Sequence, residues 1–453
     1  MSTVDRISPP TSAIPANAGS GSTHSSTAAY SGPFDMARAR RQLRAALIGN
    51  VFEFYDFMVY AFLAATLARK FFYGSEMAAL LSSFAAFGVG FLARPLGGAL
   101  IGRFADTHGR RSAMLLTVVG MAIGTVGIGL LPTYASIGLT APILLVVLRL
   151  IQGLAAGGEW GTSAAFIVES APPDRRGFFG SFGQSSVALA ILVSNLIVLA
   201  VNSSFTAAQM DAWAWRVPFL LGALLVPVGF YMRRNMEETP AYERTHAAPE
   251  TDAALATNEG PIVMMGRAFG FTILWTVAFY VILAYMPTFL AKYAGLSGSG
   301  ALLSNSVALL VIVIAVPCFG RLSDRIGRKP LLLASCLGFV VLGYPLFHIL
   351  LNHGTWITIL AAQIVMNLLI SMFSGAGPAA ICEMFPTRSR TALMSFSYSL
   401  STALFGGFAP FVATWLIAKT GSPIAPTLYL IGSAIVTALV VFRMKETAHR
   451  RLR

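Results

Sequence analysis

The sequence has few charged residues and few cysteines for a chain of 453 residues. Charged side chains make up 11% of it and hydrophobic ones 56%, whereas soluble domains are about 25% charged. The long apolar runs leave no polar face for water, which disfavours a soluble helical protein. Ten-residue stretches of alternating polarity, which would indicate a β-barrel, are missing. The composition therefore predicts an all-α membrane protein.

Motifs for catalysis and cross-linking are also missing. Cys318, Cys336 and Cys382 are an odd number of cysteines without metal-ligand spacing, which excludes a disulfide framework. No metal cluster, nucleophile elbow or phosphate-binding loop stands out. We therefore expect no enzyme, no cofactor and no bound metal.

The N-terminal segment lacks both hydrophobic periodicity and the apolar core of a signal peptide. Residues 1–37 consist mostly of Ser, Thr, Ala, Pro and Gly, a composition typical of disorder. We predict a disordered cytoplasmic tail over residues 1–43. The first apolar span is then expected to act as the insertion signal.

Twelve apolar stretches are long enough to cross a bilayer, which takes about 20 residues each. They predict six-helix bundles over 44–233 and 263–443, a polar cytoplasmic linker over 234–262 and a cytoplasmic tail over 444–453. In the fourth stretch, Gly153, Gly157, Gly158 and Gly161 predict close helix approach. The predicted spans are 44–68, 78–101, 112–131, 142–168, 178–201, 215–233, 263–290, 299–319, 330–351, 355–378, 391–418 and 424–443.

The chain repeats itself. Residues 102–111 read GRFADTHGRR and residues 320–329 read GRLSDRIGRK, each between two apolar runs. Two further patterns recur in the same order at nearly the same separation: Glu169, Pro172 and Arg176 as Glu383, Pro386 and Arg390, and Met236, Glu238 and Thr239 as Met444, Glu446 and Thr447. In a membrane protein such a duplication indicates a secondary transporter whose site lies between the halves.

The distribution of positive charge predicts the orientation. Of the 32 Lys and Arg residues, the outer segments would hold only Arg69, Lys70, Arg216, Lys292 and Lys419, and the spans Arg94 and Arg149. All others fall on the predicted cytoplasmic side. Both termini are then cytoplasmic. Because topology accounts for the net charge of +13, we expect no nucleic acid partner.

These segments resemble a known family. The loop GRFADTHGRR, its copy, and RLIQGLAAGGEW at 149–160 are similar to motifs of the major facilitator superfamily. GNVFEFYDF, FLARPLGGALIGRFAD, AGGEWG, WAWRVPF and EETPAY together resemble its metabolite:proton symporters, over about residues 40–447. The resemblance implies a twelve-helix monomer in a bacterial inner membrane. It also implies proton-driven uptake of citrate or tricarballylate, 2-oxoglutarate, shikimate, proline or betaine.

Five charged residues fall inside the predicted spans, all in the first half: Glu53, Asp56, Arg94, Arg149 and Glu159. Each costs about 2.5–3.5 kcal/mol to insert, so each needs a partner or a water-filled path. We predict that the three carboxylates couple protons, and that the two arginines bind a substrate carboxylate bidentately. The alternative is a set of fixed ion pairs that orient the helices.

The second half offers uncharged polar residues at the depth of the predicted site. We predict that they complete the substrate site with aromatic faces and amide groups, the alternative being contacts between helices only. They are Tyr280, Tyr285, Asn305, Gln363 and Asn367.

The repeated loops predict a gate. Their basic residues hold each loop at the interface, and the aspartate is then available to pair with a base or a helix N-terminus. We predict a cytoplasmic latch that holds the halves together, the alternative being topology alone. Its members are Arg103, Asp106, Arg110, Glu169, Arg176, Asp324, Arg328, Glu383 and Arg390.

Three functions fit these observations. The first is proton-coupled import of a small organic carboxylate such as citrate or 2-oxoglutarate, by alternating access. The second is proton-coupled import of zwitterions such as proline or betaine. The third is a membrane sensor that keeps the fold without transport.

Overall fold

The structure is a computed structural model that describes residues 54–108, 110–157, 159–234, 260–352, 355–386 and 389–448. It also leaves out the side chains of some helical residues, among them Asp106, Arg110 and Glu159. Glu53, the predicted tail 1–43 and most of the linker 234–262 lie outside the described residues. The domain boundaries in those segments therefore stay predictions.

The first half begins with helical residues 54–62, followed by α2 (Ala64–Phe71). Its long helices are α3 (Glu76–His108), α4 (Arg110–Leu130), α6 (Thr140–Ala155) with α7 (Glu159–Glu169), α8 (Arg176–Ser204) and α10 (Val217–Arg234). The short helices α5 (Tyr134–Ile137), α9 (Ala207–Ala212) and η1 (Ala214–Arg216) lie in the connections at one end of the bundle.

The second half starts at α12 (Pro261–Phe279), which continues through the π-helix η3 (Tyr280–Tyr285) into α13 (Met286–Tyr293). It proceeds through α14 (Gly298–Ile326), α15 (Arg328–Asn352) and α16 (Trp356–Glu383). It ends with α17 (Arg390–Ser401), the π-helix η4 (Thr402–Gly406), α18 (Ala409–Thr420) and α19 (Pro426–Arg443). Single π-turns inside long helices often mark functional sites.

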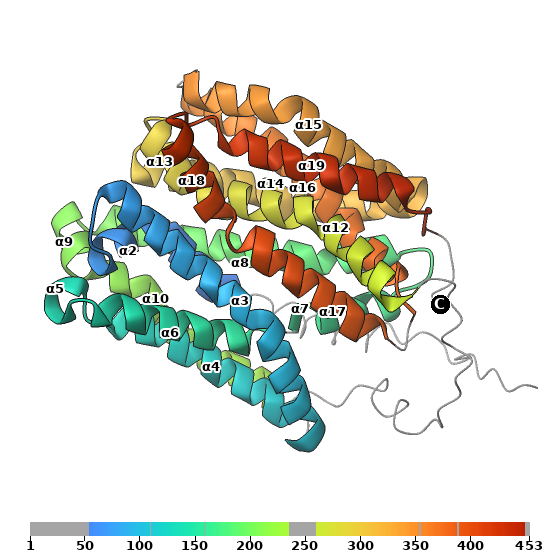
Figure 1. The fold of residues 1–453 in the computed structure, drawn as a ribbon, viewed down its shortest axis with the longest axis horizontal. Coiled ribbons are helices and arrows are strands. Elements are labelled where there is room, and N and C mark those ends of the chain that lie inside the picture. Colours follow the sequence, from blue (N-terminus) through green and yellow to red (C-terminus); the bar gives the residue numbers. More distant parts are fainter. Residues whose placement is uncertain are drawn as a thin grey trace, which may run out of the picture.

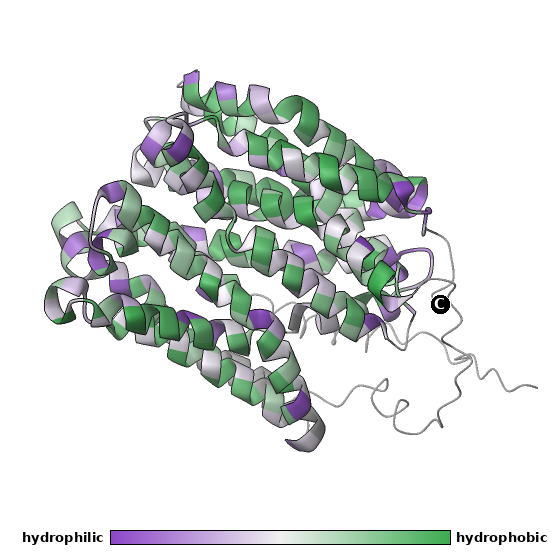
Figure 2. Ribbon diagram, in the orientation of Figure 1, coloured by the Kyte–Doolittle hydropathy of each residue, from purple (hydrophilic) through white to green (hydrophobic). Residues whose placement is uncertain are grey.

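The helices have the length and polarity of membrane spans. Within the described ranges, nine are long and apolar enough to cross a bilayer. Two shorter apolar helices, Leu115–Leu130 and Ala214–Leu224, and the helical residues 54–71 occupy the places of the other three predicted spans. Figure 2 shows hydrophobic residues along the helices and hydrophilic ones gathered toward their ends. The predicted twelve-helix membrane fold is confirmed.

The helices form two bundles that correspond to the two halves of the sequence (Figure 1). They meet along α8 of the first half and α14 of the second, which pack along their lengths. Aromatic rings also meet across the boundary: Phe91 and Tyr280 with centroids 5.1 Å apart, and Phe84 and Tyr285 at 5.4 Å. The boundary between the halves is therefore closed by side chains at its centre.

Glycines bring α3 and the α6–α7 segment into close contact. A Cβ atom on Gly153 would lie 1.8 Å from the Gly90 carbonyl oxygen, and one on Gly157 would lie 2.2 Å from the Arg94 carbonyl oxygen. No other residue fits at these two positions without moving backbone. The predicted close approach is confirmed at Gly153 and Gly157, whereas Gly158 lies outside the described residues.

Candidate functional site

Three charged side chains are buried together within the first half. Arg149 on α6 is 0% exposed, Arg94 on α3 is 4% exposed, and Asp56 on the first helix is 7% exposed. Glu53 and the Glu159 side chain, predicted for the same region, lie outside the described residues. Among the side chains that the structure describes, this cluster thus contains two cations and one carboxylate.

The ring of Phe57 contacts both guanidinium groups. The Arg94 Cζ atom lies 4.3 Å from the Phe57 centroid and the Arg149 Cζ atom lies 4.7 Å from it. Arg149 also lies 4.5 Å from the Tyr60 ring, and Arg94 lies 4.5 Å from the Phe91 ring. Such cation–π contacts stabilise a desolvated cation by about 2 kcal/mol. The aromatic rings therefore hold both guanidinium groups in place without neutralising their charge.

A chain of hydrogen bonds joins Arg149 to Asp56. Arg149 Nη1 donates to Gln152 Oε1 at 2.8 Å, and Gln152 Nε2 donates to Thr125 Oγ1 at 2.7 Å. The Thr125 side chain in turn hydrogen-bonds the Asp56 carboxylate, which also interacts electrostatically with Arg149. The sequence analysis missed Gln152 and Thr125. Gln152 lies one helical turn from Arg149, a spacing that could have pointed to it, whereas nothing in the sequence distinguishes Thr125.

Tyr280 is the second-half residue that lies at this cluster. It interacts electrostatically with Arg149, and its ring packs edge-on against Phe87 and Phe91 of α3. It is also the first residue of η3, so the π-helix changes the direction of side chains where the halves meet. The structure thus brings Tyr280 to Arg149, while its role in a substrate site stays a prediction.

The other predicted second-half residues take part in polar contacts of the helices. Tyr285 accepts a hydrogen bond from Thr414 at 3.3 Å and packs against Phe84. Gln363 donates to Ser304, and the Asn367 amide donates to the Gln363 carbonyl oxygen at 3.0 Å. These bonds, which join or lie within second-half helices, match the alternative interpretation of interhelical contacts.

Asn305 takes part in a polar contact across the boundary. Its amide donates to Asn195 Oδ1 at 3.4 Å, and Asn195 donates to Ser306 Oγ and to the Leu302 carbonyl oxygen, both at 2.7 Å. All three side chains are buried. Asn195 on α8, which the sequence analysis missed, therefore joins the two halves away from the basic loops.

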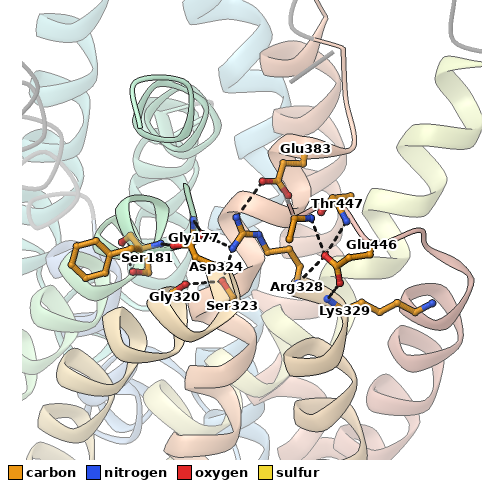
Figure 3. A network of polar contacts seen from close by, with 12 residues as sticks. Gly177, Ser181, Gly320, Ser323, Asp324, Arg328, Lys329, Glu383, Glu446 and Thr447 are labelled. Carbon is orange, nitrogen blue, oxygen red and sulfur yellow. Dashed lines mark hydrogen bonds and ion pairs between the residues drawn. The ribbon is translucent and has the colours of Figure 1, made fainter. Parts of the chain in front are cut away.

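Asp324 joins the halves at the end of the molecule that bears the basic loops, which we call the basic end. Its two carboxylate oxygens accept the backbone N–H groups of Gly177 and Phe178, each at 2.8 Å. These N–H groups belong to the first turn of α8, in the other half. Arg328 also pairs with Asp324 at 2.7 Å (Figure 3). Asp324 therefore caps a helix across the boundary, one of the two pairings that the loop sequence predicts.

A second contact crosses the boundary at the basic end, and it is an ion pair. Arg390 at the start of α17 is buried and pairs with Glu169 at the end of α7, with 2.5 Å between Nη1 and Oε1. The repeat relates this pair to Glu383 and Arg176, which interact electrostatically. Glu383 also pairs with Arg328 at 3.3 Å. Six of the nine predicted latch residues therefore lie in one network of contacts.

The first-half loop is described only in part. Arg103 is exposed near the end of α3. The side chains of Asp106 and Arg110 lie outside the described residues. The latch in this loop stays a prediction.

Glu446 connects the end of the described chain to this network. Its carboxylate accepts N–H groups of Arg328 at 2.9 Å, Lys329 at 3.0 Å, and Thr447 and Ala448 at 2.9 Å (Figure 3). Burial disfavours the ionised carboxyl, but these four hydrogen bonds outweigh it, so the pKa of Glu446 lies below its usual value. Glu446 therefore fixes the N-terminus of α15 and the position of Arg328.

Comparisons with known proteins agree with this architecture. The family described as "Sugar (and other) transporter" matches residues 43–265, and "Major Facilitator Superfamily" matches residues 269–453. The chain is similar to the proton:xylose symporter XylE bound to 6-bromo-6-deoxy-D-glucose, with a TM-score of 0.76 at 20% identity, over 92% of this chain and 98% of that one. The fold is therefore that of a secondary transporter.

Relatives in sequence define the class of transporter more narrowly. The "Citrate-proton symporter" of Klebsiella pneumoniae is 37% identical, over 85% of this chain and 87% of the relative. The "Proline/betaine transporter" of Escherichia coli K12 is 33% identical, over 92% and 86%. The chain belongs to the major facilitator superfamily, among its metabolite:proton symporters. It is thus a multi-pass membrane protein and a proton-coupled symporter, and the relatives are transporters rather than enzymes.

Proposed function

We propose that the chain imports a small organic carboxylate, such as citrate or 2-oxoglutarate, together with protons. The supporting observation is the pair of buried guanidinium groups that both contact the Phe57 ring. Their Cζ atoms are at most about 9 Å apart, since they lie 4.3 Å and 4.7 Å from the same ring centroid. One short molecule with two carboxylates can pair with both groups, because each guanidinium binds a carboxylate bidentately.

The charge balance of the described side chains also favours an anionic solute. Two buried arginines face one carboxylate, Asp56. The Nε atom of Arg149 is buried without a hydrogen-bond partner. A solute carboxylate would supply the missing acceptor, and it would reduce the repulsion between Arg94 and Arg149. The 37% identity to a citrate–proton symporter supports the same solute class.

Import of proline or betaine is the second candidate function. A zwitterion needs one cation for its carboxylate and aromatic faces for its ammonium group. Trp160 of the first half stacks on Tyr398 of the second at 3.6 Å, and Trp275 packs edge-on against both. This aromatic cluster lies at the boundary of the halves, and relatives named for proline and betaine transport cover 92% of the chain.

We infer a transport cycle from the contacts at the two ends of the boundary between the halves. We infer that the basic end faces the cytoplasm of a bacterium, with both chain termini on that side and the chain acting as a monomer. Asp324 and the Glu169–Arg390 pair hold this end closed. Opening it requires both contacts to break, and Asn195 with Asn305 would hold the opposite end closed meanwhile.

Asp56 is the proton carrier in this proposal, with Glu53 and Glu159 as further candidates. It is buried among helices of the first half, beside an arginine that binds the solute. The proton gradient supplies the energy, and no cofactor is needed. Uptake should therefore rise as the external pH falls and collapse when a protonophore is added.

Uptake assays in cells that express the chain can test this proposal. The assays would use labelled citrate, 2-oxoglutarate, shikimate, proline and betaine. Arg94→Lys and Arg149→Lys keep the charge but lose the planar fork, so each should raise the apparent KM for a carboxylate at least about tenfold. Arg103→Lys, at an exposed position, is the matched control. Uptake of betaine alone would support the second candidate, and carboxylate uptake that is unchanged in both core variants would refute the arginine site.

A further inference from the structure

The three hydrogen bonds between Arg149 and Asp56 all point in the same direction. Arg149 donates to Gln152, Gln152 donates to Thr125, and Thr125 bonds the acceptor carboxylate. The two bridging side chains are buried, Gln152 at 0% and Thr125 at 1% exposure. A cation stands at one end of the chain and a carboxylate at the other. Such a chain strengthens cooperatively in a medium of low dielectric constant.

The backbone around this chain of hydrogen bonds leaves space for its side chains. A Cβ atom on Gly124 of α4 would lie 2.1 Å from Gln152 Cγ, so only glycine lets Gln152 lie against α4 beside Thr125. A Cβ atom on Gly90 of α3 would lie 3.1 Å from the Arg149 carbonyl oxygen and 3.4 Å from Arg149 Nε. Three helices, α3, α4 and α6, are therefore shaped around these side chains.

We propose that Thr125 and Gln152 are positioning residues that couple the protonation of Asp56 to the orientation of Arg149. This inference rests on the proposed role of Arg149 in binding the solute carboxylate. The ionised Asp56 is the strongest acceptor at the end of the chain, and it holds Arg149 on Gln152. The hydrogen bonds through Thr125 and Gln152 thus form a link between the proton site and the solute site.

Protonation weakens this link. When a proton from water binds an Asp56 oxygen, the carboxyl becomes neutral and its hydrogen bond with Thr125 loses charge assistance. Gln152 is then held less firmly, and Arg149 is released toward a solute carboxylate. In the opposite direction, a solute that draws Arg149 away from Gln152 favours protonation of Asp56. Proton and solute therefore bind with positive cooperativity, which by linkage is equal in both directions.

Other ionisable groups surround the link. Tyr55 interacts with Asp56, and Tyr60, Arg94 and Tyr280 interact with Arg149. Glu53 and the Glu159 side chain lie outside the described residues. The test should therefore change the uncharged residues of the link and leave every charge in place.

The experiment compares Thr125→Val, which keeps the shape, with Thr125→Ser, which keeps the hydroxyl group. Purified full-length protein in liposomes is assayed for binding of labelled citrate, or of the panel carboxylate that the parent transports best, at about pH 6 and about pH 8. Thr117→Val, at another buried threonine of α4, is the matched control. Gln152→Met, of similar volume, tests the other bridging residue.

We expect the parent, Thr125→Ser and Thr117→Val to bind at least about tenfold more tightly at the lower pH. Thr125→Val and Gln152→Met should bind with affinities that differ by less than about threefold between the two pH values. A parent-like pH dependence in both of these variants would overturn the link while leaving the proposed function intact. A parent without pH dependence would instead overturn the coupling of proton and solute on which the link rests.

Discussion

Removing the charge of Asp324 should open the basic end of the molecule. Asp324→Asn keeps one acceptor oxygen but loses the second acceptor and the negative charge beside the N-terminus of α8. Hydrogen bonds to a charged group contribute about 1.5–3 kcal/mol each. We therefore expect closure to weaken by about 2–3 kcal/mol, which shifts the equilibrium roughly 30- to 150-fold toward the open form. Arg328 keeps Glu383 as a partner, so the fold of the second half should survive.

Cysteine labelling at the basic end can measure this shift. Ser395 of α17 lies against Gly161 of α7, because a Cβ atom on Gly161 would be 1.9 Å from Ser395 Oγ. We would introduce Ser395→Cys in a chain whose Cys318, Cys336 and Cys382 are replaced, and measure the maleimide labelling rate from the basic end.

In Asp324→Asn, the labelling rate should rise roughly 30- to 150-fold. It should stay at the parent value in Asp174→Asn. The Asp174 side chain is 70% exposed and pairs with its neighbour Arg175 in the same half. Solute binding at equilibrium should change much less than the transport rate. An Asp324→Asn variant that is labelled as slowly as the Asp174→Asn control would refute the role of Asp324 in closure.

Three further predictions concern the proton site, the packing and the end of the chain. Asp56→Asn should abolish accumulation of the solute against its gradient while protein still reaches the membrane, and accumulation at the parent level under a pH gradient would contradict this. Gly153→Ala should reduce the yield of folded protein strongly, because its Cβ would meet backbone, whereas Gly102→Ala, with no atom within 4 Å, should not. Glu446→Gln should lower the thermal midpoint at pH 7 by a few degrees, about 1–2 kcal/mol. Because the pKa of Glu446 is lowered, its stabilisation is present above the unfolded-state value and is lost as the pH falls through the folded-state value, so parent and variant should converge in acid.

The sequence predicted most of the architecture because its signals are local or repeated. Apolar length defines the spans, and the two copies of the basic loop define the halves. Gly153 and Gly157 predicted that another helix lies close to the fourth span, because glycine has no side chain to hold a neighbouring backbone away. The sequence did not show that this neighbour is α3.

The contacts inside the site could not be predicted in the same way. In the first half, charge inside a span was the signal in the sequence. It points to Asp56 and Arg149 but not to the uncharged Thr125 and Gln152 that join them. The depth of a residue in the membrane also does not specify the direction in which its side chain points. Tyr280 and Gln363 are both buried in the second half, yet only Tyr280 is brought to Arg149, where η3 turns the helix at the boundary.

The contact between Asp324 and the start of α8 requires different chemical groups from the two halves. The second half must supply a carboxylate, whereas the hydrogen-bond donors of the first half are peptide N–H groups. Gly177 must still lack a side chain, because a Cβ atom there would lie 2.6 Å from the Gly320 carbonyl oxygen. Phe178 contributes its backbone N–H to this contact, so its side chain can vary without loss of that hydrogen bond. When the halves separate, those N–H groups meet water at the membrane surface rather than hydrocarbon. In the proposed transport cycle, the contact can thus be broken and remade without leaving a polar group in lipid.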